Sequence, residues 1–256
     1  MRPHRTYQAV RIEQGNSQPT NDELVVEVPL EIVINGNAWT MTMQSPGNEL
    51  ELVRGLLFSE DIYRNKEIAP EMELHFNDKA QRSLVHVTIQ KDELKEGFSN
   101  SAQLLSVSSC GICGRTEMKN LTGDPFAEAA FSSTDLHSYF SSMRHHQQLF
   151  DETGGCHGIG AFDRNGKLLL VREDIGRHNA VDKVIGALLD SGELKTAHVL
   201  TVSGRVSFEI IAKAFMAGIP VMASVSAPSS LAVDLAKEFG MKLIGFCRED
   251  RLTVYS

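Results

Sequence analysis

The chain has 256 residues, of which 42% are hydrophobic and 23% charged, so it can bury the core of one or two globular domains and disorder is excluded as the default. With 25 basic and 33 acidic residues its net charge is −8, which argues against a general nucleic-acid-binding surface, because phosphate contacts need clustered Lys and Arg. No stretch approaches the roughly 18 apolar residues of a membrane span, and four cysteines are too few for a secreted disulfide framework, so we expect a cytoplasmic protein without a membrane partner.

The first hundred residues predict a small α+β domain, assigned to residues 1–103. Apolar and polar residues alternate on both sides of Asn35-Gly36, a pair that supplies the positive φ angles of a tight hairpin turn. A later segment carries Leu50, Val53, Leu56 and Leu57 at helical spacing. The predicted elements are strands at 23–34 and 39–43, a helix at 48–59, and strands at 73–76 and 84–89.

A segment rich in Ser, Gly, Cys and Thr, residues 104–124, predicts an exposed functional loop that links this domain to the next. From residue 125 to 256 strands and helices alternate, which favours a layered α/β domain with a mainly parallel sheet. The predicted elements are a helix at 134–150, strands at 157–162 and 168–171, a helix at 179–189, a strand at 199–202, a helix at 208–216, a strand at 221–224, a helix from Pro228 to Gly240, and a strand at 242–246. Within these helices, Asp182 and Lys183 read as a pair on the helix surface.

Cys110 and Cys113 form a C-x-x-C pair in the loop, flanked by Gly111 and Gly114. Glycine lets the backbone approach a partner closely, and the neighbouring cation Arg115 would lower the pKa of a thiol and raise the reactive thiolate population. The spacing alone leaves three interpretations open: thiol chemistry, a metal knuckle, or two incidental thiols.

Zinc is the main alternative, because Cys156-His157 would complete a Cys₃His ligand set with the C-x-x-C pair. Against zinc, Cys156 lies in a glycine-containing turn that leads into a strand, and Cys247 has no nearby sulfur or histidine partner in the sequence. We therefore expect no bound metal. A thioredoxin-like site is also disfavoured, since no apolar strand runs directly into Cys110.

Three polar segments follow predicted strands of the α/β domain, where backbone amides and helix dipoles receive anions. Each alone reads as a solvated loop, but together they place five arginines at strand ends in a protein of net negative charge, which favours a phosphate-bearing ligand. The candidate binding residues are Arg172, Glu173, Asp174, Gly176, Arg177, His178 and Asn179 in the first segment, Ser203, Gly204 and Arg205 in the second, and Phe246, Cys247, Arg248, Glu249, Asp250 and Arg251 in the third.

The loop SSCGICG, the run REDIGRHNAVDKVIG from Arg172 to Gly186, the segment SGRVSFE and the C-terminal GFCRED closely resemble the FdhD proteins, accessory sulfurtransferases of formate dehydrogenase. The resemblance implies a cytidine-deaminase-like α/β domain beside the smaller N-terminal domain. It also implies an enzyme that takes persulfide sulfur from a cysteine desulfurase and delivers it to Mo-bis(molybdopterin guanine dinucleotide), or the tungsten equivalent, for formate dehydrogenase.

Carried over by position, Cys110 corresponds to the persulfide cysteine and Cys113 to its partner, while residues 246–251 form part of the cofactor-binding stretch. The resemblance further implies a homodimer, and GDP as a partial mimic of the cofactor. Deamination itself is rejected, because no histidine is followed two residues later by glutamate, as a zinc deaminase requires. The alternative function is a zinc-binding chaperone of a partner oxidoreductase that transfers no sulfur.

Overall fold

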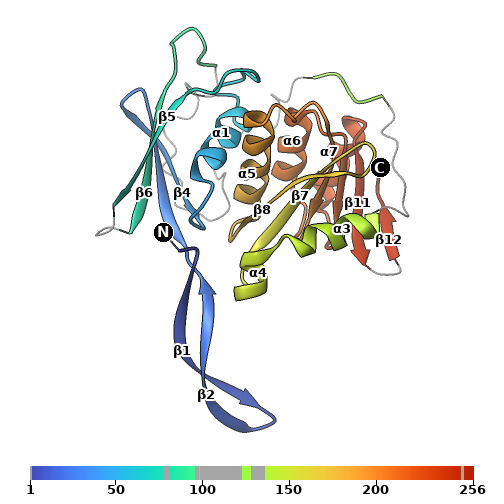
Figure 1. The fold of residues 1–256 in the computed structure, drawn as a ribbon. Coiled ribbons are helices and arrows are strands. Elements are labelled where there is room, and N and C mark those ends of the chain that lie inside the picture. Colours follow the sequence, from blue (N-terminus) through green and yellow to red (C-terminus); the bar gives the residue numbers. More distant parts are fainter. Residues whose placement is uncertain (1, 78–80, 96–97, 99–122, 128–135, 249–250) are drawn as a thin grey trace.

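The computed structural model describes residues 2–77, 81–95, 98, 123–127, 136–248 and 251–256. Two sheets stand side by side with helices between them, and a long hairpin projects from the body (Figure 1). This arrangement confirms the predicted α/β class, in which a layered α/β part adjoins a smaller N-terminal α+β part. No helix in these ranges is both long and apolar enough to cross a membrane.

The N-terminal sheet has four strands in the order β4-β3-β6-β5, covered on one face by helix α1. Alternation of buried and half-buried residues along β3 gives the period-two pattern of a sheet with one face in the core. The helix buries Leu52, Val53 and Leu57 on this face, whereas Leu50, which was grouped with Val53 and Leu57 by helical spacing, is 36% exposed. The elements are β3 (Val28–Ile34), β4 (Asn37–Gln44), α1 (Glu49–Ser59), β5 (Glu71–Asn77) and β6 (Arg82–Thr88).

The projecting hairpin, which we call the arm, consists of β1 (His4–Glu13) and β2 (Asn16–Val25). Residues 23–25 belong to the arm, so the prediction of one strand over 23–34 is wrong at its start: the core strand begins at Val28. The arm is exposed over most of its length, and its base is fixed to the body where Val25 packs against Gly155 and His4 pairs with Glu152. Because the arm buries so little, its sequence lacks the apolar alternation by which strands are predicted.

The C-terminal sheet has six strands in the order β12-β11-β10-β9-β7-β8, with α5, α6 and α7 on one face and α3 on the other. Only β9, β10 and β11 run parallel; the pairs β7 with β8, β7 with β9, and β11 with β12 are antiparallel, so the predicted mainly parallel sheet is in fact mixed. The reason is local, because turns of a few residues cannot return the chain in the parallel direction. The strands are β7 (His157–Asp163), β8 (Leu168–Asp174), β9 (Ala197–Val202), β10 (Val221–Ser224), β11 (Lys242–Arg248) and β12 (Arg251–Val254); the helices are α5 (Arg177–Asp190), α6 (Phe208–Ala217) and α7 (Ser230–Glu238).

The predicted single helix at 134–150 is instead two helices, α3 (Leu136–His145) and α4 (Gln148–Thr153). Between them Gln147 leaves the helical region, with φ −93° and ψ 70°. No glycine or proline marks this break. The break follows from tertiary contacts, described below, in which a strand caps the start of α4.

Helices α1 and α5 join the two sheets through backbone contact at glycine. A Cβ on Gly186 would lie 1.8 Å from the carbonyl oxygen of Glu51, and one on Gly55 would lie 1.9 Å from that of Asp182. Buried ion pairs flank this contact: Lys213 with Asp182 at 2.9 Å and Lys183 with Asp174 at 2.8 Å. Asp182 and Lys183 are therefore not a surface pair, because each is 1% exposed and bonded to a different partner.

Candidate functional site

One edge of the six-stranded sheet collects the segments that the sequence singled out. The pairing of His157 with Asp174, and of Ser224 with Val202, brings the carboxyl ends of β8, β9 and β10 to the amino end of β7. The register of β10 with β11 places the end of β11 at the same edge. This is the edge at which α/β sheets bind ligands.

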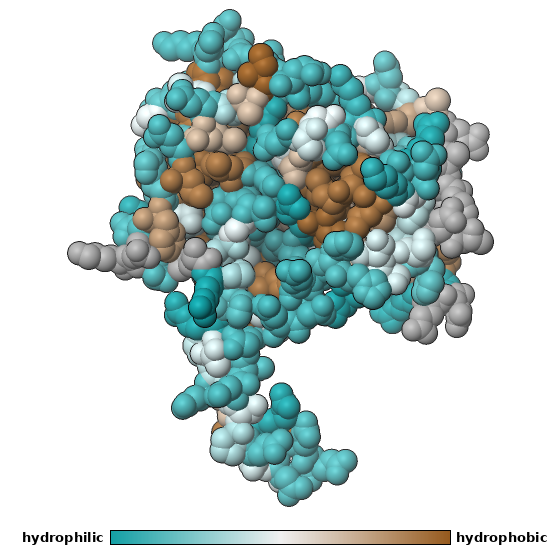
Figure 2. Space-filling model, viewed as in Figure 1, coloured by the Kyte–Doolittle hydropathy of each residue, from teal (hydrophilic) through white to brown (hydrophobic). Residues whose placement is uncertain are grey.

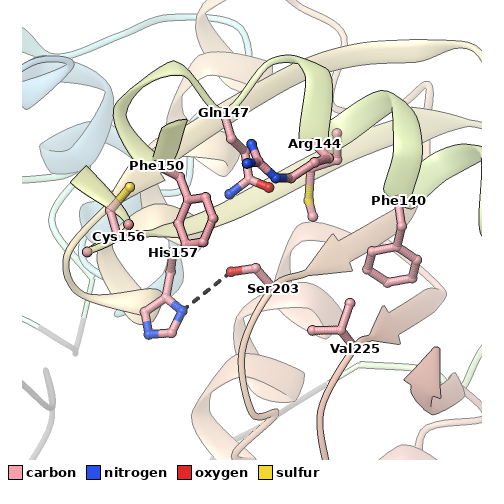
Figure 3. Close-up of a pocket in the computed structure, with 11 residues that line it drawn as sticks. Phe140, Arg144, Gln147, Phe150, Cys156, His157, Ser203 and Val225 are labelled. Atoms are coloured by element: carbon pink, nitrogen blue, oxygen red, sulfur yellow. Dashed lines mark hydrogen bonds between the residues drawn. The ribbon is translucent and has the colours of Figure 1, made fainter. Parts of the chain in front are cut away.

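A cavity of about 620 Å³ opens at this edge, between the sheet and helices α3 and α4 (Figure 3). This volume falls within the range of small-molecule sites. Its walls are mainly apolar or aromatic with a few polar side chains, and they include Phe140, Arg144, Gln147, Phe150, His157, Ser203 and Val225.

The polar floor of the cavity is formed by His157 and Ser203. Ser203 Oγ accepts a hydrogen bond from the Gly158 amide at 2.9 Å and lies 3.4 Å from His157 Nδ1. Burial, together with the positive charges of Arg177 and Arg205, lowers the pKa of His157. The imidazole is thus held neutral in a positively charged setting.

Of the five arginines predicted to bind a ligand, Arg177 and Arg205 lie near His157. Gly204 lies against the His157 ring, where a Cβ would be 2.9 Å from Cε1, and next to the Arg177 side chain. Arg177 Nε is buried without a hydrogen-bond partner, whereas Arg205 is exposed. Arg177 is also the first residue of α5, which follows the N-cap Gly176, so the helix N-terminus opens beside its guanidinium. Two cations and free backbone amides suit an anion here.

The other residues of the first segment are engaged within the protein. Arg172 donates two hydrogen bonds to the carboxylate of Glu51 on α1, and Asp174 accepts from the Ser45 amide as well as pairing with Lys183. Asn179 donates to the Met43 carbonyl at 2.7 Å, and His178 Nε2 lies 3.0 Å from Ser207 Oγ. Arg172, Asp174 and Asn179 thus bond to the N-terminal part and His178 to the start of α6, so all four are held by protein partners.

Glu173 supports the site by capping a helix. Its carboxylate accepts hydrogen bonds from the backbone amides of Leu149 and Phe150, both at 2.9 Å, at the start of α4. It also accepts the thiol hydrogen of Cys156 at 3.2 Å. Glu173 therefore fixes α4 over the cavity.

The described residues of the third segment lie at the end of β11 and the start of β12. Phe246 has a φ of 54°, a left-handed conformation that is uncommon for an aromatic residue, and its amide donates to the Ser226 carbonyl. Arg248 and Arg251 lie opposite each other in the hairpin register and are exposed. Glu249 and Asp250 lie outside the described residues.

The cysteines divide into two kinds. Cys110 and Cys113 lie outside the described residues, and the described cysteines, Cys156 and Cys247, are both buried and free. Burial and the Glu173 carboxylate raise the pKa of Cys156 far above its usual range, and burial raises the pKa of Cys247 to about 11. Both therefore stay protonated thiols at neutral pH. Among the described residues no cluster of three or more His, Cys, Asp or Glu is arranged to hold a metal.

Most of the cavity residues were not predicted from the sequence, among them Phe140, Arg144, Gln147 and Phe150 of α3, α4 and the break between them. Arg144 lies over the Phe150 ring, 4.8 Å from its centroid, and pairs with Asp151. They carry no motif, and they converge only because the chain breaks between α3 and α4. His157 had been considered only as a zinc ligand.

Residues 25–256 match the FdhD/NarQ family. A "Sulfur carrier protein FdhD" from Mycolicibacterium paratuberculosis is 41% identical over 94% of this chain and 93% of its own length. One of the same name from Sulfolobus acidocaldarius is 35% identical over 96% and 94%. The crystal structure of a candidate formate dehydrogenase accessory protein from Desulfotalea psychrophila superposes with a TM-score of 0.75 at 25% identity, covering 99% of this chain and 97% of that one.

Proposed function

Because this chain belongs to the FdhD/NarQ family, we propose that it is a sulfur carrier that works through a cysteine persulfide on Cys110. In this proposal it accepts sulfur from a cysteine desulfurase and delivers it to the molybdenum or tungsten bis-guanine-dinucleotide cofactor for formate dehydrogenase. The cytoplasmic location expected from the sequence belongs to the same proposal.

The state of the other two cysteines carries the proposal. A sulfur carrier needs a thiolate that an external persulfide can reach. Cys156 and Cys247 are 6% and 7% exposed, and both have raised pKa values. Of the four cysteines in the sequence, Cys110 and Cys113 are left, in the C-x-x-C segment beside Arg115.

The transfer is a thiol exchange that needs no external oxidant. The Cys110 thiolate attacks the terminal sulfur of the desulfurase persulfide; the new S–S bond forms on Cys110 as the old one breaks, and the desulfurase cysteine leaves as its thiolate. In this proposal Cys113 is the partner thiol, which can displace hydrosulfide from the Cys110 persulfide and form a Cys110–Cys113 disulfide.

The cofactor is the cargo, and we propose that its nucleotide moiety binds at the sheet edge described above. Arg177, Arg205 and the N-terminus of α5 suit a diphosphate, and the 246–251 hairpin adds Arg248 and Arg251. Arg172, Glu173, Asp174, His178 and Asn179 would act through the residues they hold in place, since each is bonded within the protein. GDP is then a partial mimic of the cargo.

The proposed carrier is a homodimer, as two-fold assemblies are common among soluble proteins. Light scattering at micromolar concentrations is expected to give twice the monomer mass.

Intact-mass spectrometry tests the central proposal. After incubation with a cysteine desulfurase and cysteine, the protein is expected to gain the mass of one sulfur, and to lose it on treatment with a reducing thiol. A protein that gains no sulfur under conditions in which the desulfurase is itself persulfidated is not a carrier.

A further inference from the structure

The strongest unexplained feature of the cavity is the side chain of Gln147. It is 3% exposed, lines the cavity, and projects into it in Figure 3. Within the described parts of the chain its side-chain amide makes no hydrogen bond. Its amide atoms are not among the fully buried, unpartnered side-chain atoms of the described residues, so the amide reaches the open space of the cavity and is available to a ligand.

We propose that the Gln147 amide reads the polar edge of a planar heterocycle bound in the cavity between α3, α4 and the sheet. The ring class is one that carries an amino group and a carbonyl on the same pyrimidine edge. This inference rests on the proposed function, because guanine and pterin, the two ring systems of the proposed cargo, share that edge.

The Gln147 side chain is not used to cap the helix that it precedes. Gln147 is the N-cap residue of α4, and its side chain makes no capping hydrogen bond. The Glu173 carboxylate caps α4 instead, by accepting from the amides of Leu149 and Phe150. The Gln147 amide is thereby free to face the cavity.

Gly158 makes room for the same side chain. A Cβ at this position would lie 2.4 Å from Gln147 Nε2 and 2.5 Å from Cδ, so any larger residue on β7 would displace the amide. The amide thus rests on the strand backbone between the helix break above and the glycine below. Because contacts on both sides hold Gln147 in place, its amide can select a ligand by the arrangement of the ligand's hydrogen-bonding groups.

The rest of the cavity suits a flat ring. Phe140 and Phe150 are aromatic and Val225 is apolar, so they offer surfaces for stacking, while Ser203 and His157 add hydrogen-bonding groups on the floor. A primary amide carries a donor and an acceptor side by side. Its Nε2 can donate to a ring carbonyl while its Oε1 accepts from the neighbouring ring N–H, which pairs the two edges.

The experiment compares the wild type with Gln147→Leu, which keeps the size of the side chain but removes the amide, and with Gln148→Leu as a matched control on the exposed side of α4. Calorimetry measures the affinity of each variant for GDP, which carries the base, and for inorganic pyrophosphate, which lacks it. We expect Gln147→Leu to bind GDP roughly tenfold or more weakly, with pyrophosphate affinity unchanged, because only the base contact is lost. Gln148→Leu should match the wild type for both.

Equal loss of GDP and pyrophosphate affinity in Gln147→Leu would make the residue merely structural, and unchanged GDP affinity would remove it from the site; either result overturns the inference. Binding of hydroxymethylpterin then shows which ring the cavity holds. If the pterin competes with GDP and its binding needs Gln147, the cavity is assigned to the pterin. If Gln147→Leu weakens GDP binding and the pterin does not bind, the cavity is assigned to guanine. Persulfide formation on Cys110 is scored separately. Failure of sulfur transfer therefore counts against the proposed function and leaves the reading of Gln147 standing.

Discussion

Cys156 donates its thiol hydrogen to Glu173, with Sγ 3.2 Å from Oε1, and this carboxylate also accepts two backbone amides of α4. One side chain thus ties the end of β8 to the start of β7 and to the helix over the cavity. Burial and this carboxylate together raise the pKa of Cys156, so its thiol stays protonated beside the cavity.

Replacing Cys110 by alanine is expected to abolish persulfide formation, because Cys110 is the proposed sulfur acceptor and the two described cysteines, Cys156 and Cys247, are buried protonated thiols. Cys156→Ser is the matched control, since a serine hydroxyl still donates to Glu173. Intact mass after desulfurase treatment is the readout. Sulfur retained in Cys110→Ala, or lost in Cys156→Ser, would contradict the assignment.

Glu173→Gln is expected to destabilise the protein by about 1–3 kcal/mol, because glutamine has a single acceptor oxygen: one of the two amides at the start of α4 loses its acceptor and the other keeps only a neutral hydrogen bond. The change should also lower the pKa of Cys156, although burial, the larger cause, keeps it raised. Urea unfolding and thiol alkylation as a function of pH measure the two effects. Glu238→Gln, on the exposed surface of α7, should change neither.

His178 should make the stability fall in mild acid. Burial, followed by the charges of Arg177 and Lys213, lowers its pKa to about 4, although Glu209 acts in the opposite direction. The unfolded chain takes up a proton near pH 6.5, whereas the folded protein resists until about pH 4, so the stability is full above pH 6.5 and falls as the pH drops between these values.

We expect a loss of about 1–2 kcal/mol between neutral pH and pH 5 from this histidine. His178→Gln should flatten that part of the profile measured by urea unfolding, while His145→Gln, at an exposed position of α3, should leave it as in the wild type. A profile equally steep in His178→Gln would show that another group is responsible.

GDP is expected to bind more tightly than ADP, and Arg177→Ala combined with Arg248→Ala should weaken GDP by tenfold or more through the phosphates. Arg164→Ala, in the turn between β7 and β8 at the opposite sheet edge, is the matched control. Calorimetry decides: no effect of the double substitution would return these arginines to the role of solvated loop charges, and equal affinities for GDP and ADP would show that the site does not select guanine.

Gly186→Ala should destabilise the protein, although the same change in an open helix position stabilises by up to about 1 kcal/mol. A methyl group at this position meets the Glu51 carbonyl oxygen, and backbone cannot move aside as a side chain can. Thermal unfolding shows directly whether Gly186→Ala lowers or raises the stability. A raised midpoint would mean that α1 and α5 separate at little cost.

Most of the regular structure was predicted because its signals are local. The Asn35-Gly36 turn adopts positive φ at both residues, and the helix at 48–59 and the strands of the α/β part follow their apolar spacing within a few residues. The arm escaped prediction because an exposed hairpin needs no apolar alternation. The break before Gln148 escaped because its cause, Glu173, is supplied by a strand some 25 residues away.

The same distinction separates the parts of the site. The convergence of Arg177, Ser203 and Arg205 could be predicted from a topological rule about strand ends. That Arg172, Glu173 and Asp174 turn toward protein partners could not, because adjacent residues on a strand point to opposite faces and the partners, Glu51, α4 and Lys183, come from other elements. Only the packed molecule decides which charges remain available to a ligand.

The glycine contact between α1 and α5 also determines when the packing of α1 can be completed during synthesis. The N-terminal sheet leaves the ribosome first. The backbone of Glu51 packs against Gly186, which is synthesised more than a hundred residues later. At typical elongation rates this separation lasts on the order of ten seconds. During that interval the apolar face of α1 that later meets α5 has no partner, so a nascent chain stalled before Gly186 should be the form most dependent on chaperones.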